Sequence, residues 1–114
     1  MRSPILVNSA VVLETTNALE LRIFRGQATR QDAEKALHNL EVDIRHGVLN
    51  VTSVPPITWD TARDLSRTHS AKLGTRSLDI LQVAIAIVLR ADTFLTFDRN
   101  QAALAQAEGL KTQI

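Results

Sequence analysis

A glutamate in the middle of a predicted apolar helix face is the first sign of chemistry in this sequence. On a helical wheel Glu14 falls in one arc with Leu13 and Leu21, and Asn17 shares that arc one turn further on. Burying an ionised carboxylate among apolar side chains costs several kcal/mol unless the group is paired, protonated or bound to a cation. Glu14 is therefore a candidate functional residue, and an ion pair with Arg25 is the alternative explanation.

Two aspartates stand at predicted helix starts. Asp79 and Gln82 are spaced i, i+3 and so share one face of a segment that is otherwise apolar. Asp98 directly follows the predicted strand 93–97. Each aspartate could simply stabilise a helix N-terminus, Asp79 through the macrodipole and Asp98 as an N-cap. Because ligands of parallel α/β sheets collect where strands lead into helices, we expect Asp79, Asp98 and Glu14 to form one acidic cluster.

Carboxylates that lie close together predict a metal site. They raise one another's pKa unless a cation neutralises them, and Mg²⁺ or Mn²⁺ prefers such ligands. A metal of this kind activates water and stabilises charge on a phosphate, as metal-dependent nucleases require. Arg76 and Arg99, each near a candidate acid, are predicted to bind phosphates, and ordinary exposed arginines are the alternative.

The elements that must position these residues alternate between strand and helix. Short apolar runs predict the strands, of which 5–7 is expected to be buried, and helical spacing of apolar residues predicts the helices. The predicted strands are 5–7, 48–51, 93–97 and 110–114, and the predicted helices are 10–25, 30–46, 58–72, 78–90 and 99–107. This alternation predicts an α/β fold with a parallel sheet.

Several local signals set the helix boundaries. Gly26 is a predicted C-terminal stop, and Thr29 with Asp32 has the pattern of a capping box. Ser77 is the predicted N-cap of the most apolar helix. Trp59 is predicted to be a core residue of the helix 58–72, and His69 is expected to pack near Trp59 or to face solvent.

Composition limits the possible functions. The chain has 114 residues, of which 45% are apolar and 22% charged, as expected for one globular domain. It has no cysteine, which excludes disulfide scaffolds, zinc fingers and thiol catalysis and fits a reducing compartment. The net charge of +1 excludes a protein that coats nucleic acid but not an enzyme that cuts it. The longest apolar run, 80–89, is too short to span a bilayer, so a cytoplasmic protein without membrane contact is expected.

Three segments resemble successive motifs of a known family. They are LETTNALELRIFRG at 13–26, GTRSLDILQVAIAI at 74–87 and FLTFDRNQ at 94–101. In this order and spacing they resemble the PIN domain, and within it the VapC-type ribonuclease toxins of toxin–antitoxin pairs. The resemblance implies a three-layer α/β/α fold with a parallel sheet. It also implies a Mg²⁺- or Mn²⁺-dependent ribonuclease whose partners are its RNA substrate and a cognate antitoxin protein.

The resemblance assigns roles to particular residues. Glu14, Asp79 and Asp98 match acids of the family's metal site, Thr96 matches the hydroxyl of the last motif, and Asn17 matches a polar position beside the glutamate. Arg76 and Arg99 keep the phosphate-binding role proposed above.

The sequence also departs from the family pattern. A PIN domain begins with a strand that ends in an aspartate and continues into helices, and no acid precedes Glu14 here. We therefore expect residues 1–114 to be a single PIN-like domain without that strand and those first helices, with weakened metal binding. Loss of a central strand would leave open strand edges, which recruit other strands, so a homodimer, a rearrangement or a separate N-terminal piece is expected.

Three functions compete on this sequence. The first is a metal-dependent endoribonuclease of the toxin type, impaired by the missing aspartate. The second is a catalytically inactive PIN-like remnant that binds an antitoxin or a second copy. The third is an unrelated small α/β protein whose acids only cap helices.

Overall fold

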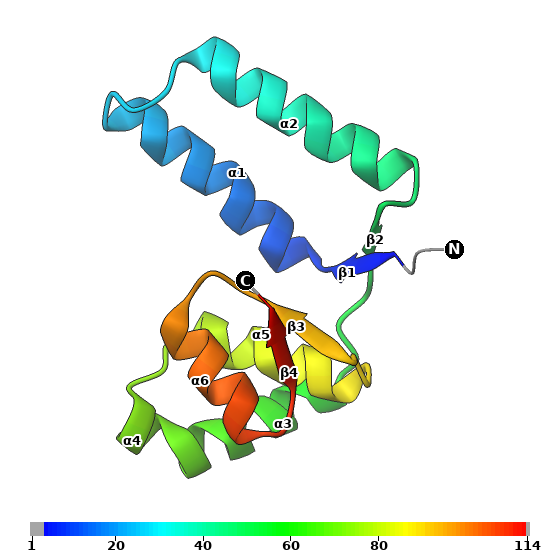
Figure 1. Cartoon of the computed structure of the whole chain (residues 1–114), viewed down its shortest axis with the longest axis vertical. Helices are drawn as coiled ribbons and strands as arrows, with labels where there is room; N and C mark the ends of the chain where they lie inside the picture. The colour runs from blue at the N-terminus through cyan, green and yellow to red at the C-terminus, as the bar shows by residue number, and fades with distance from the viewer. Residues whose placement is uncertain (1–3, 114) are drawn as a thin grey trace. The chain divides into compact units, whose positions relative to one another are not determined.

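The computed structural model describes residues 4–113, in two compact units that divide between Ser53 and Val54. The first unit contains β1 (Ile5–Val7), α1 (Ser9–Phe24), α2 (Arg30–Arg45) and β2 (Leu49–Val51). The second contains α3 (Ile57–Leu65), the π-helix η1 (Ser66–Ser70), α4 (Ala71–Leu73), α5 (Ser77–Val88), β3 (Thr93–Leu95), α6 (Arg99–Ala107) and β4 (Lys111–Gln113). Figure 1 shows these elements in chain order.

The strands pair within each unit. β1 runs parallel to β2 with Leu6 opposite Asn50, and β3 runs parallel to β4 with Phe94 opposite Thr112. Parallel strands joined through helices confirm the predicted α/β class. The expected strand 110–114 is confirmed as β4 over Lys111–Gln113, while Leu110 precedes the strand and residue 114 lies outside the described residues.

Local capping chemistry shapes the first unit, a helical hairpin between two short strands (Figure 1). The side chain of Asn8 accepts the N–H groups of Ala10 and Val11 at 3.0 and 3.2 Å and starts α1. Thr29 and Asp32 form the predicted capping box at the start of α2, with both bonds at 3.0 Å. Gly26, just after α1, has a φ of +70°, a left-handed conformation that glycine adopts without a Cβ clash.

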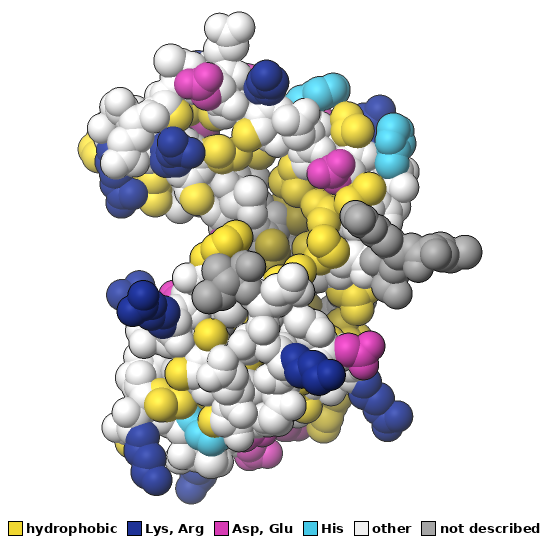
Figure 2. Space-filling view, in the orientation of Figure 1, with side chains coloured by type: hydrophobic (Ala, Val, Ile, Leu, Met, Phe, Trp, Pro, Cys, Tyr) yellow, Lys and Arg dark blue, Asp and Glu magenta, His cyan; other side chains and the backbone are white. Residues whose placement is uncertain are grey.

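The first unit buries little apolar surface. α1 has no buried residue, and Ala33 is the buried residue of α2. Leu13 is 69% exposed and Phe24 is 87% exposed. Apolar side chains of this unit are visible on the surface in Figure 2. The prediction that residues 5–7 form a buried strand is wrong, because Ile5 and Leu6 are both exposed on a sheet of only two strands.

The second unit has a hydrophobic core built around α5. The segment Leu78–Leu89 is apolar on nearly every side and predicts a buried helix, and α5 packs against α3 and α6. The buried cluster joins these helices to Phe94 of β3, and it contains Leu65, Ile80, Val83, Ala84, Ala86, Phe94, Leu104 and Ala105. This core holds the beginning of α5 next to the end of β3.

One helix prediction in the second unit needs correction. The expected α-helix 58–72 contains a π-helical segment, η1, between α3 and α4, and α4 ends at Leu73. In an α-helix Leu73 would lie about 80° around the axis from Leu65, eight residues earlier. The wider π turn removes much of that difference, and both residues contact the core cluster.

The predicted cap and the predicted core tryptophan are also wrong. Ser77 is the first residue of α5, and Arg76 occupies the N-cap position without a side-chain cap hydrogen bond. Trp59 is 59% exposed, because the α3 residues that face the core are Ala62 and Leu65. No helix within residues 4–113 combines the length and apolarity needed to cross a membrane.

Candidate active site

Asp79 and Asp98 lie close enough to influence each other in the second unit. Asp79 is the third residue of α5 and is half-buried. Burial is the largest cause that raises the pKa of Asp79, and the negative charge of Asp98 raises it further. The backbone N–H and the positive charge of Arg76 partly offset this rise. The two carboxylates therefore repel each other within one site.

Asp98 begins α6, as predicted, and its orientation is set by backbone hydrogen bonds. Its Oδ1 accepts the N–H of Asn100 at 2.8 Å and that of Gln101 at 3.0 Å. The N–H of Asp98 in turn donates to the hydroxyl of Thr96 at 3.0 Å. Thr96 is only 8% exposed, so this support is largely shielded from water.

Gln101 connects the two acids, and sequence reasoning missed it. Its Oε1 accepts the hydroxyl of Thr96 at 2.6 Å, and its Nε2 donates to Oδ1 of Asp79 at 3.4 Å. Asp98 and Gln101 have the spacing of a capping box, which is the signal that could have identified Gln101. In a capping box the Gln side chain would bind the N–H of Asp98. Here the hydroxyl oxygen of Thr96 accepts that N–H, so the side-chain amide of Gln101 can bind Asp79.

Glu14 and Asn17 belong to α1 in the first unit, where both are exposed. The prediction that Glu14 sits within a buried apolar face is wrong for this unit, since α1 has no buried residue. The alternative pair with Arg25 does not form among residues 4–113. Because Glu14 and the aspartates lie in different units, their convergence stays a prediction.

The family comparison adds to this geometry. Residues 1–107 match the PIN domain family. The chain belongs to the PIN domain family. Among curated proteins and solved structures no match was found. PIN domains generally are nucleases that bind RNA and use divalent metal ions.

The side chains of this PIN domain fit a divalent cation in part. No group of three or more acids and histidines in residues 4–113 is arranged to hold a metal ion. The pair of Asp79 and Asp98 nevertheless supplies two hard oxygen ligands whose mutual repulsion a cation would relieve. Two carboxylates with retained water molecules form a site typical of Mg²⁺.

The two predicted phosphate-binding arginines flank the acid pair of the PIN domain. Arg76 precedes α5 and Arg99 is the first residue of α6, and both are exposed. Neither forms an ion pair with a carboxylate in the described part of the chain. Their guanidinium groups are therefore available for phosphate oxygens.

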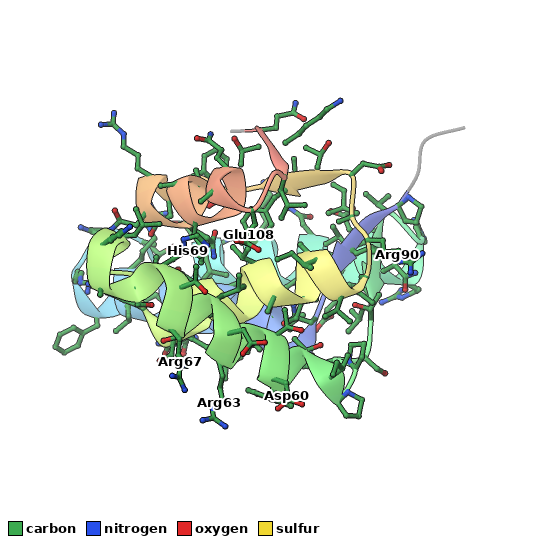
Figure 3. All side chains as sticks on the ribbon, turned by 90° about the horizontal axis from the view of Figure 1, so that it is seen from below. Asp60, Arg63, Arg67, His69, Arg90 and Glu108 are labelled. Atoms are coloured by element: carbon green, nitrogen blue, oxygen red, sulfur yellow. The ribbon has the colours of Figure 1, made fainter. Side chains whose placement is uncertain are left out.

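A histidine of the PIN domain has an acidic partner that the sequence did not predict. His69 was expected to pack near Trp59 or to face solvent. Its Nε2 instead lies 2.7 Å from Oε2 of Glu108, and Figure 3 shows the two side chains directed toward each other. The pair joins η1 to the residue that ends α6, so its role is to tie these elements together.

Proposed function

We propose that this PIN domain is a metal-dependent endoribonuclease of the VapC toxin type that hydrolyses RNA phosphodiesters. The observation that carries the proposal is the pair of Asp79 and Asp98, which Gln101 joins through hydrogen bonds to both acids. Burial raises the pKa of Asp79, and the negative charge of Asp98 raises it further. An ionised pair of this kind is costly for the fold, and a hard divalent cation held by these carboxylates would offset the cost.

Each residue of the proposed site has a role that follows from its chemistry. Asp79 and Asp98 would hold Mg²⁺ or Mn²⁺, and Glu14 of α1 would complete the set of ligands. Thr96 and Asn17 would orient the ligands or the water. A cation bound by these residues would supply an activated water and offset negative charge on the phosphate. Arg76 and Arg99 bind the flanking phosphates.

The proposed partners are the RNA substrate, a cognate antitoxin protein and a second copy of the chain. The exposed apolar side chains of α1, among them Leu13 and Phe24, support a protein partner on that helix. We place the protein in the cytoplasm, because a chain without cysteine suits a reducing compartment. Residues 1–114 act in this proposal as a single PIN-like domain.

The same exposed helix supports a second candidate function. In it the chain is an inactive PIN-like module that binds an antitoxin or a second copy and cuts no RNA. Glu14 then lies within a protein interface, and the aspartates only stabilise helix starts.

Calorimetric titration with Mn²⁺ separates the two functions. We expect saturable binding by the wild type, and a Kd raised beyond the millimolar range in Asp79→Asn and in Asp98→Asn. Asp60→Asn is the matched control, since Asp60 is an exposed acid on α3 that points away from the core (Figure 3). RNA cleavage should be lost in the first two variants and kept in the control.

Two outcomes of these experiments would contradict the proposed ribonuclease function. A wild type that binds no Mn²⁺ at millimolar concentration supports the inactive module. Cleavage that survives both Asp79→Asn and Asp98→Asn removes these residues from the active site.

A further inference from the structure

We infer that Gln101 is a positioning residue that holds the carboxylates of Asp79 and Asp98 in place for a cation, an inference that rests on the proposed function. Gln101 reaches both acids: its backbone N–H donates to Asp98 at 3.0 Å, and its side-chain Nε2 donates to Asp79 at 3.4 Å. The backbone and the side chain of this one residue thus donate to the two different acids. The residue therefore couples the beginning of α6 to that of α5.

The orientation of the Gln101 amide follows from a directed series of hydrogen bonds. The N–H of Asp98 can only donate, so the oxygen of Thr96 accepts it. The hydroxyl proton of Thr96 then goes to Oε1 of Gln101, at a short distance of 2.6 Å. Nε2 is left facing Asp79. The reversed amide would set Oε1 against the carboxylate of Asp79, which is two acceptors with no proton between them.

This series also selects which oxygen of Asp98 faces a ligand. Both capping hydrogen bonds end on Oδ1. Oδ2 of Asp98 makes no hydrogen bond with any residue of the described range 4–113. One oxygen thus fixes the side chain to α6, and the other keeps its acceptor capacity for a cation.

Metal affinity gives the first test. Groups that orient metal ligands typically change affinity by 10–100-fold when they are removed. Because the contact with Asp79 is long, we expect Gln101→Leu to raise the Kd for Mn²⁺ by about tenfold, at the lower end of that range. Gln106→Leu is the matched control on the same helix, since Gln106 donates to Thr112 at 2.8 Å and touches neither acid. An unchanged Kd in Gln101→Leu overturns the inference.

Gln101→Glu tests the inference through the rise in melting temperature on adding Mn²⁺, which a purely structural role of Gln101 would not change. The new carboxylate can still accept the hydroxyl of Thr96, but it adds a third negative charge beside Asp79. We expect a lower melting temperature without metal and a larger rise on adding Mn²⁺ than in the wild type, because hard cations favour additional carboxylates. Gln106→Glu should leave the Mn²⁺-induced rise unchanged. A rise in Gln101→Glu no larger than that of the wild type contradicts the inference.

A metal-free double-mutant cycle keeps this inference separate from the proposed function. Gln101→Leu should lower the urea midpoint less in an Asp79→Ala background than in the wild type, because its partner is already absent. Equal losses in both backgrounds overturn the coupling of Gln101 to Asp79. A wild type that fails to bind Mn²⁺ refutes the proposed function, and this cycle still decides whether Gln101 organises the pair.

Discussion

The two compact units of the chain differ most in their hydrophobic cores. Ala33 is the buried apolar residue of the first unit, whereas the other buried apolar residues of the described chain belong to the second. α1 is rich in apolar residues, yet it exposes Leu13 and Phe24. α5 buries Val83 and Ala84 completely.

The difference shows that apolar content alone does not make a core helix. α5 has α3 and α6 as neighbours, and the three share a cluster of contacting side chains. α1 packs against α2, a helix whose polar residues leave it only one buried position. The first unit also contains capping hydrogen bonds and exposed ion pairs, such as Arg30 with Glu20 at 2.7 Å. An exposed pair of this kind contributes little stability by itself.

The largest expected effect comes from removing core volume in the second unit. Leu104 is fully buried, so Leu104→Ala should lower the free energy of unfolding by about 2–5 kcal/mol. Leu13→Ala on α1 should change it by less than about 0.5 kcal/mol. Urea denaturation followed by circular dichroism measures both. An equally large loss for Leu13→Ala would mean that this face of α1 is covered in solution.

An intermediate effect is expected at the capping box of the first unit. Thr29→Ala removes the side-chain acceptor of the Asp32 N–H and should cost about 1 kcal/mol. Thr15→Ala is the control, because Thr15 is an exposed residue within α1 and alanine has the higher helix propensity. Thermal unfolding of both variants should show destabilisation for Thr29→Ala alone. A loss of stability in Thr15→Ala would show that α1 depends on contacts beyond its own hairpin.

The smallest effects are expected from pH, and they should have opposite signs in the two units. The pKa of Asp79 is raised above 3.8, mainly by burial, so its ionisation opposes folding at neutral pH. That cost is relieved as the pH falls through the raised pKa and is gone below 3.8. The pKa of Asp32 is lowered below 3.8, mainly by the backbone N–H of Thr29. Its stabilising contribution is complete above 3.8 and is lost as the pH falls through the lowered value.

Two asparagine variants measure these opposite pH dependences of folding stability. At neutral pH Asp79→Asn should be more stable than the wild type and Asp32→Asn less stable. The advantage of Asp79→Asn should vanish below pH 3.8, and the deficit of Asp32→Asn should shrink only below that pH. Urea midpoints measured across the acid range check both variants. Shifts of the same sign in the two variants would contradict the assigned causes.

Local signals in the sequence predicted the local structure well. The capping box of Thr29 with Asp32 and the stop at Gly26 depend on contacts within one turn, and both are confirmed. The prediction that Trp59 is a core residue was wrong, because the side of α3 that faces the core depends on helices far away in sequence. Ser77 was misjudged by one position, since a threonine or serine near a helix start can be the cap or the first helical residue.

In the candidate site too, roles that depend on neighbouring residues were predictable, and roles that depend on distant residues were not. The capping role of Asp98 was readable because its partners follow directly along the chain. Gln101 was missed because its function depends on Asp79, 22 residues earlier, and on a hydroxyl that displaces it from the expected bond. The role of Glu14 with these residues remains a prediction, since it joins two separate units.

The π-helical segment η1 has a consequence for the length of the chain. A π turn holds one residue more than an α turn, so the protein already absorbs an extra residue between Leu65 and Ala71 without interrupting the helical rod. Shortening this stretch by a single residue could restore ordinary α geometry there, with Leu73 still beside the core. His69 lies within this stretch, so the same deletion would change its position around the helix axis and disturb its contact with Glu108 at the end of α6.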